Sequence, residues 1–317
     1  MGPITCEDII EPVGTDRGMG QAPPRLVIGV VGVGRAGAVL AAALARAGHR
    51  VGAVHAVSEV SRLRAEALLP QAEITSVERV LATSDLVMLT VPDDVLGELV
   101  RGLAQTGAFR RGQFVMHASG RHGIGVLAPA ADAGALPLAL HPVMTFTGTS
   151  LDLDRLADCP FGVTAPDALR PVAEALVVEM GGEPIWVAEP DRALYHAALA
   201  NASNHLVTLT TQSMDLLRAA GVSEPGRMLG PLMSASLDNA LRSGDPALTG
   251  PVVRGDATTV REHLKALTAV APESRAAYLA MARLTADRAM SAGLLPADRA
   301  EALLDVLSEP TRNGDTA

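Results

Sequence analysis

The sequence predicts an α/β fold in which a doubly wound parallel sheet precedes an all-helical domain. Up to about residue 187, apolar runs rich in β-branched residues alternate with segments whose apolar residues recur at helical spacing. Beyond that point only the helical spacing recurs. The chain has 317 residues, 48% of them hydrophobic, which is enough to bury a core in each of two domains.

The first domain is expected to span residues 25–188, after a leader of residues 1–24 that is rich in glycine and proline. The apolar runs at residues 26–31 and 85–91 are typical of strands buried on both faces of a parallel sheet. The expected strands cover residues 26–31, 50–57, 73–75, 85–91, 113–118, 136–141 and 161–164, with helices at 36–47, 61–69, 77–82 and 95–105 between the first five. The pattern changes after residues 185–187.

The second domain is expected to span residues 189–308 and to serve substrate binding and dimerisation. Its pattern predicts helices at residues 191–220, 224–243, 256–269, 272–292 and 296–307. No internal repeat interrupts either domain, and the polar residues 309–317 are expected to form a loose tail.

Residues 32–37, Gly-Val-Gly-Arg-Ala-Gly, match the G-x-G-x-x-G pattern of dinucleotide-binding domains. The pattern follows a predicted strand and opens a predicted helix, which is the context that makes it specific. Gly32 permits a tight turn, Gly34 lets the backbone approach a diphosphate, and Gly37 allows the helix to pack closely on the strand. We therefore predict a Rossmann domain with a cofactor held by Gly32, Val33, Gly34, Arg35, Ala36 and Gly37. The alternative is an ordinary strand–helix turn without a ligand.

The residues after the second strand favour NADP(H) over NAD(H). An NAD site places an acid at the end of that strand, but here Glu59 comes late and Ser58, Ser61, Arg62 and Arg64 lie nearby. Hydroxyl and guanidinium groups suit a 2′-phosphate, so Ser58 and Arg62 are predicted to bind it. The alternative is that these arginines belong to a solvated helix face. Val91 and Pro92, at the end of the fourth strand, are expected to line the cofactor crevice.

The candidates for chemistry follow the fifth and sixth strands and continue on the first long helix. Ser119 and Gly120 could present a hydroxyl and backbone amides to cofactor and substrate, and His141 could contact the substrate, although a structural role is favoured for His117 and His141. His196, Ser203 and Asn204 share a helix face, and His196 is the best candidate for a proton donor, with Asn204 orienting the substrate. The alternative for His196 is a hydrogen-bonded histidine of the core.

The segment of residues 248–256, between two helices of the second domain, contains a candidate residue for binding a substrate carboxylate. Arg254 could bind a carboxylate through two parallel hydrogen bonds. Asp256 is better placed to cap the following helix.

Composition excludes several other classes of protein. The net charge is −9 and no isolated basic cluster is present, so a nucleic-acid partner is not expected. Glycines and Arg35 interrupt the apolar stretch 26–47, so a membrane span is not expected either. Cys6 and Cys159 have no metal-binding spacing, and their number suits a reducing cytoplasm.

Residues 26–285 resemble the family that joins a Rossmann-like domain to a C-terminal domain of unknown function. This family is related to 6-phosphogluconate and β-hydroxyacid dehydrogenases, ketopantoate reductase and pyrroline-5-carboxylate reductase. The segments that carry the resemblance are residues 32–37, 85–93, 117–120, 141–142, 195–204 and 248–256. The resemblance implies a helical C-terminal domain, NADP use and a homodimer formed through that domain.

The chain departs from the related enzymes at one position. The resemblance implies a lysine acting on the substrate carbonyl from the first long helix, followed by an asparagine one or two turns later. Here His196 takes the lysine position, Asn204 matches the asparagine, and the single lysine of the chain, Lys265, lies elsewhere. The resulting interpretation is an NADPH-dependent reductase of a small carboxylated 2-oxo acid resembling ketopantoate, or of a cyclic imine. The alternative is a protein that senses NADP(H) or a metabolite without turnover.

Overall fold

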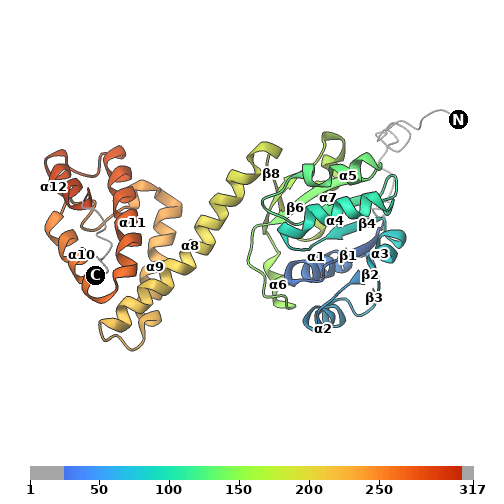
Figure 1. Ribbon diagram of the computed structural model, residues 1–317, viewed down its shortest axis with the longest axis horizontal. Coiled ribbons are helices and arrows are strands. Elements are labelled where there is room, and N and C mark those ends of the chain that lie inside the picture. Colours follow the sequence, from blue (N-terminus) through green and yellow to red (C-terminus); the bar gives the residue numbers. More distant parts are fainter. Residues whose placement is uncertain (1–24, 309–317) are drawn as a thin grey trace, which may run out of the picture. The chain divides into compact units, whose positions relative to one another are not determined.

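The computed structural model describes residues 25–308 (Figure 1), so the predicted leader 1–24 and tail 309–317 lie outside the described residues. The chain divides into two compact units, which meet between Leu199 and Ala200. The sheet pattern ends near residue 187, as the sequence predicts, but the first two turns of the following helix still belong to the first unit.

The first unit is built on one eight-stranded sheet with the order β3-β2-β1-β4-β5-β6-β7-β8. From β1 the chain builds outward to β2 and β3, returns to β4 on the other side of β1, and continues from there. Its strands are β1 Val27–Val31, β2 Arg50–His55, β3 Glu73–Ile74, β4 Leu86–Leu89, β5 Phe114–His117, β6 Leu136–Pro142, β7 Pro160–Thr164 and β8 Glu183–Trp186. The order therefore reverses between β1 and β4, where doubly wound sheets have their ligand crevice.

The sheet is parallel from β3 to β6, as the sequence predicts for the whole sheet, but β7 pairs with β6 in the antiparallel sense. Between these two strands the chain forms only one helix, α6 Leu151–Arg155, of five residues. A parallel pair needs a connection that crosses the length of the sheet, usually through a longer helix. This short segment instead returns the chain from the same end of the sheet.

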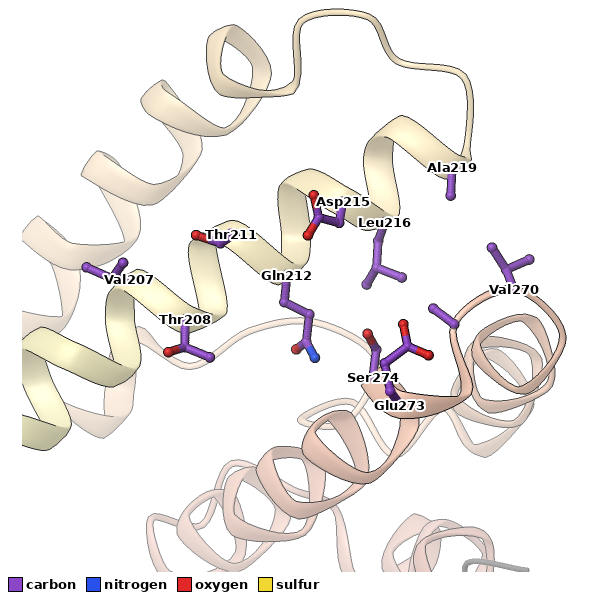
Figure 2. A pocket seen from close by; sticks show the side chains of 11 residues that line it. Val207, Thr208, Thr211, Gln212, Asp215, Leu216, Ala219, Val270, Glu273 and Ser274 are labelled. Atoms are coloured by element: carbon purple, nitrogen blue, oxygen red, sulfur yellow. The ribbon is translucent and has the colours of Figure 1, made fainter. Parts of the chain in front are cut away.

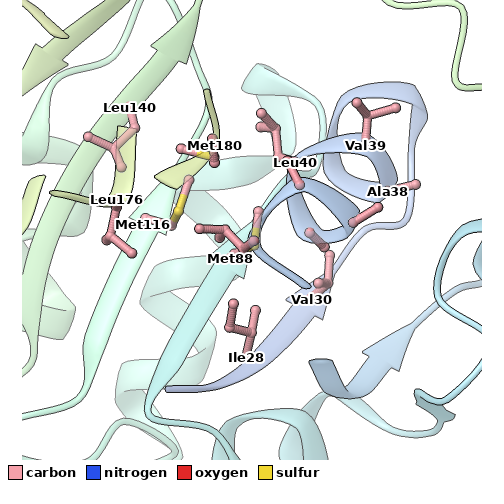
Figure 3. Close-up of a cluster of buried hydrophobic side chains, with 14 of the residues drawn as sticks. Ile28, Val30, Ala38, Val39, Leu40, Met88, Met116, Leu140, Leu176 and Met180 are labelled. Carbon is pink, nitrogen blue, oxygen red and sulfur yellow. The ribbon is translucent and has the colours of Figure 1, made fainter. Parts of the chain in front are cut away.

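Helices cover both faces of the sheet and bury two apolar cores. The helices are α1 Arg35–Arg46, α2 Glu59–Leu68, α3 Val77–Thr83, α4 Asp93–Gln105, α5 Ala128–Asp132 and α7 Arg170–Glu179. Ile28 and Met88 point to one face, where they pack against Leu40 of α1 and Leu176 of α7 (Figure 3). Side chains that alternate with them, such as Val87, point to the other face and pack with α3, α4 and α5. The first unit thus has the three layers expected of a Rossmann-like domain.

The second unit is helical, as the sequence predicts. It contains most of α8 Arg192–Ala219, followed by α9 Pro225–Ser243, α10 Ala257–Val270, α11 Pro272–Ser291 and α12 Ala297–Ser308. Its core is formed by α10, α11 and α12 with the loops beside them, and includes Val260, Leu279 and Leu303. None of the helices within residues 25–308 is long and apolar enough to cross a membrane.

The helix expected at residues 191–220 is present as α8, but it is mostly exposed in the single chain although its composition is largely apolar. Arg192 is the one buried residue of α8, whereas Leu206, Val207 and Leu209 are exposed. These three side chains are not part of the apolar core of the second unit.

Candidate active site at the carboxyl edge of the sheet

The glycine-rich turn joins β1 to α1 at the point where the strand order reverses. Gly32 has a φ of +93°, which L-residues rarely adopt, and a Cβ there would lie 2.9 Å from the Thr90 carbonyl oxygen. At Gly37 the Thr90 side chain leaves no room for a Cβ. The Thr90 hydroxyl also donates to the Gly32 carbonyl oxygen over 2.7 Å. Two of the three glycines are thus required by the protein's own packing.

Gly34 is different, because a Cβ there would find only the Thr90 carbonyl oxygen, at 3.9 Å. The glycine therefore borders open space instead of a neighbouring element. The first turn of α1 contains no acid and receives no side-chain cap, so its leading amides face no competing group of this kind. A backbone without a side chain, beside uncapped amides at a helix N-terminus, fits the diphosphate of a dinucleotide.

The other predicted cofactor ligands have mixed surroundings. Val91 packs against Gly32, and Pro92 precedes α4 at the same edge of the sheet. Ser58 caps α2 by accepting from the Ser61 amide over 3.1 Å, and Arg62 is exposed. Arg64, which the prediction only placed nearby, instead turns toward the glycine-rich turn, where its Nη1 donates to the Val33 carbonyl oxygen over 3.2 Å.

His117, at the end of β5, has a structural role. Its Nδ1 accepts from the Ser119 amide over 3.1 Å, so Nε2 carries the proton and donates to the Gly123 carbonyl oxygen over 2.9 Å. Burial lowers the pKa of His117 to about 4, against the opposing effect of the Gly123 hydrogen bond. The imidazole is neutral at pH 7 and fixes the turn that contains Ser119. The Ser119 hydroxyl is itself buried and accepts from the His122 amide over 3.2 Å.

Gly120 is where two histidines from distant parts of the chain converge. A Cβ on Gly120 would lie 2.7 Å from Cδ2 of His196 and 2.8 Å from Nε2 of His141. The two rings are perpendicular, with centroids 6.3 Å apart. The carboxyl ends of β5 and β6 and the first turns of α8 thus bring Ser119, Gly120, His141 and His196 together, all of them residues that the sequence had marked.

Tyr195, which the sequence marked only as part of a motif, fixes the tautomer of His141. Its hydroxyl lies 2.8 Å from Nδ1 of His141. Burial raises the pKa of the Tyr195 phenol, against the opposing charge of Arg192, so the phenol stays protonated and can donate a hydrogen bond to Nδ1. Burial, followed by the charges of Arg192 and His196, lowers the pKa of His141 to about 4. His141 is therefore a neutral imidazole with its remaining proton on Nε2, beside Gly120.

Arg192 is the buried cation behind this pair. It is 2% exposed and donates from Nε to the Thr164 hydroxyl over 2.8 Å and from Nη2 to the carbonyl oxygens of Ala139 and Gly162 over 3.1 and 3.0 Å. Its Nη1 has no hydrogen-bond partner within the described part of the chain. Arg192 thus ties the start of α8 to β6 and β7, and its charge opposes protonation of both His117 and His141. Sequence reasoning missed this residue, because an arginine at a helix start is ordinarily solvated.

A second tie runs from the residues before α8 to the turn after Gly120. The Glu189 carboxylate accepts from the amides of Ile124 and Gly125 over 2.7 and 2.8 Å, at the start of the 3-10 helix Ile124–Leu127. The carbonyl oxygen of Gly123, just before it, is the partner of His117. Glu189 and Arg192 therefore hold the base of α8, and with it His196, against the loop that carries Ser119 and Gly120.

The remaining predicted residues belong to the second unit, and their role in substrate binding stays a prediction. Asn204 is exposed and Ser203 half-buried on α8. Arg254 has an exposed side chain, whereas Asp256 caps α10 through the Thr259 amide over 3.0 Å, as predicted.

The second unit also has an open groove of about 540 Å³ (Figure 2), between α8 and the segment that joins α10 to α11. Gln212, Asp215 and Glu273 are among its polar lining residues, and Asp215 is already paired with Arg218. Neither the glycine-rich turn nor the histidines of the first unit line this groove, so it is not the candidate site. Within residues 25–308 no three His, Cys, Asp or Glu side chains are grouped as a metal site would require.

Comparisons with known proteins agree with this architecture. Residues 13–142 match the model of a Rossmann-like domain, and residues 159–285 match the domain of unknown function DUF2520. No curated protein matches the sequence.

Solved structures share the fold at low sequence identity. A protein described as an NADP oxidoreductase from Bacteroides fragilis is 20% identical, with a TM-score of 0.69 over 83% of this chain and 98% of its own. An imine reductase from a Pseudomonas species is 20% identical, with a TM-score of 0.59 over 90% and 100%. An imine reductase from Myxococcus stipitatus in complex with NADP⁺ is 18% identical, with a TM-score of 0.60 over 84% and 95%. The chain thus combines a Rossmann-like domain with a DUF2520 domain, the pair that its sequence predicts.

Proposed function

We propose that the protein is an NADPH-dependent reductase of a small carboxylated substrate with a C=O or C=N bond, either a 2-oxo acid resembling ketopantoate or a cyclic imine. The observation that carries this proposal is the convergence of His141 and His196 on Gly120, at the same sheet edge as the glycine-rich turn. The similar folds described as NADP oxidoreductases and imine reductases support it. The preference for NADPH over NADH rests on Ser58, Arg62 and the lack of an acid at the end of β2.

In this proposal, different residues of the site bind the substrate, polarise its double bond and supply the proton. The nicotinamide cofactor supplies the hydride when it is bound. His141 keeps a proton on Nε2 through the Tyr195 hydrogen bond, so it can donate a hydrogen bond to the substrate oxygen or nitrogen. His196, which approaches the same side of Gly120, delivers the proton that completes the reduction. Ser119 and the Gly120 amide bind the carboxylate, with Asn204, Ser203 and Arg254 proposed as further ligands from the second unit.

We also propose that the chain forms a homodimer through its helical region. Leu206, Val207 and Leu209 on α8 and Met228, Leu232, Leu237 and Leu241 on α9 are between 41% and 80% exposed. Seven large apolar side chains exposed on two consecutive helices are more than isolated surface residues and favour an interaction site. A second copy of the chain would present the same helices and cover it.

The test compares His196→Asn and His141→Asn with His205→Asn, a matched control on the exposed part of α8. NADPH oxidation is followed with a panel of 2-oxo acids and cyclic imines, and NADPH affinity is measured separately. We expect both site variants to lose turnover by about 10²-fold or more while NADPH affinity and the control stay unchanged. NADPH binding without turnover by the wild type would instead favour the sensing function, and unimpaired turnover by His196→Asn would remove the role given to His196.

A further inference from the structure

The first turn of α1 contains a cation and no acid, a combination that α7 shares. α2 and α3 have Glu59 and Glu78 in their first turns, and α4 begins with Asp93. The first turn of α1 contains no acid and begins with Arg35. A positive side chain at a helix N-terminus is repelled by the positive end of the helix dipole, and a bound anion would neutralise the side chain and the helix end together.

Arg64 approaches the same turn from α2. Its hydrogen bond to the Val33 carbonyl oxygen uses one of the five N–H donors of the guanidinium, which leaves four. The ion pairs found within residues 25–308 include neither Arg35 nor Arg64. Two guanidinium groups are therefore gathered at the glycine-rich turn without a described acid to neutralise them.

The loop between β6 and α6 brings these two arginines together at Gly148. A Cβ on Gly148 would lie 2.7 Å from Nε of Arg64 and 2.8 Å from Cγ of Arg35, and its φ is +82°. Only glycine satisfies both the backbone conformation and this close approach. The loop is a wall against which both arginine side chains are packed.

A buried carboxylate makes this wall rigid. Asp152 is fully buried and accepts from the amides of Thr147 and Gly148 over 2.8 and 2.7 Å, and from the Thr147 hydroxyl over 3.0 Å. Burial acts to raise the pKa of Asp152, but these hydrogen bonds outweigh it and hold the pKa below its ordinary value. The carboxylate stays charged and keeps Gly148 in position.

We propose that Arg35 and Arg64, backed by Gly148, form a clamp for the diphosphate of the dinucleotide, an inference that rests on the proposed function. The diphosphate fits better than the 2′-phosphate, because Arg64 is bonded inside the glycine-rich turn and Arg35 is the first residue of α1. Guanidinium groups bind phosphate oxygens through paired, charge-assisted hydrogen bonds. Packing against the rigid Gly148 loop restricts both arginine side chains before the nucleotide binds, which reduces the conformational entropy that they lose on binding.

The test measures nucleotide affinity directly, by calorimetric titration of NADPH and of NADH without substrate. We expect Arg35→Ala and Arg64→Ala each to weaken both nucleotides by a similar factor of at least about tenfold. Arg46→Ala is the matched control, since Arg46 is exposed in the last turn of α1, at the opposite end of the helix from Arg35. Arg62→Ala should weaken NADPH but not NADH, since Arg62 is proposed to bind the 2′-phosphate. Arg64→Lys, which keeps the charge but not the fork, should lose part of the affinity. Thermal melting verifies that each variant is folded.

The outcomes separate the clamp from the function on which it rests. A loss confined to NADPH would assign the arginines to the 2′-phosphate and overturn the diphosphate clamp. Unchanged affinity in both alanine variants would overturn it as well, while leaving the proposed reductase intact. A wild-type chain that binds neither nucleotide would overturn the proposed function and the clamp together.

Discussion

Replacing Gly120 by alanine tests the convergence of the two histidines at its tightest point. The added Cβ would lie 2.7 Å from Cδ2 of His196 and 2.8 Å from Nε2 of His141, whereas ordinary contact begins at 3.4 Å, so the rings must retreat by 0.7 and 0.6 Å (3.4 − 2.7 and 3.4 − 2.8). His141 cannot retreat freely because Tyr195 holds its Nδ1. Overpacking of this kind costs about 1–3 kcal/mol of stability.

The larger effect of Gly120→Ala should be on turnover. Displacing catalytic groups by most of an ångström lowers rates by about 10–100-fold. NADPH affinity should stay near the wild-type value, because Gly120 lies outside the glycine-rich turn. Turnover is measured as NADPH oxidation, and ring displacement as changes in the NMR signals of His141 and His196, which need no known substrate.

Gly102→Ala is the matched control, because a Cβ there meets nothing within 4 Å. It lies inside α4, so alanine should raise stability by about 1 kcal/mol and leave turnover alone. If Gly120→Ala retained wild-type turnover and unshifted signals of both histidines, the two rings could not be packed against Gly120 as the structure has them, and the site argued from their convergence would be refuted.

Two further predictions need no substrate. The first concerns pH, because His117 and His141 have pKa values of about 4 in the folded chain against an ordinary 6.5. Between pH 6.5 and 4 the unfolded chain therefore binds up to two protons more than the folded chain. The free energy of unfolding falls as pH falls, with a slope approaching about 2.7 kcal/mol per pH unit. Urea unfolding between pH 5 and 6.5 measures the slope, which His141→Asn should reduce by about half; a flat wild-type profile would contradict the burial of neutral histidines. The second concerns assembly: Leu232→Glu should convert a species of twice the chain mass into one of single mass in light scattering, while Val178→Glu, equally exposed but on α7, should not. A wild type of single mass would contradict the proposed dimer.

The fold and the residues of the sheet edge could be predicted because their signals are local in the sequence. The run of residues 26–31, the glycines that follow it and the helical spacing beyond are adjacent in the chain, and each has one physical interpretation. Ser119, His141 and His196 could be marked because polar residues that end strands or interrupt apolar helices are unusual. Their meeting at Gly120 is a property of the tertiary structure, because the three residues lie far apart along the chain.

The residues that the sequence could not assign are those whose role depends on direction or burial. Arg62 and Arg64 differ by two positions on α2, which rotates one side chain about 200° from the other, and Arg64 is the one that reaches the glycine-rich turn. Arg192 gives no sequence signal of burial, since its partners are carbonyl oxygens and a hydroxyl instead of an acid. The antiparallel β7 follows from a connection whose helix proved too short to cross the sheet.

The resemblance implies a lysine at the position of His196, and the structure places a buried cation, Arg192, near that position. A lysine would bring a permanent cation to the substrate, and in this chain a buried cation already lies one turn earlier on the same helix. Burial, followed by the charge of Arg192, keeps His141 neutral, so we propose that His141 donates a hydrogen bond instead of acting as an acid. A reduction must still receive a proton, and a histidine can supply and recover one near neutral pH, where a lysine would need a strongly lowered pKa. We therefore expect turnover, measured as NADPH oxidation, to fall by about 10²-fold or more in His196→Asn and by less in Tyr195→Phe.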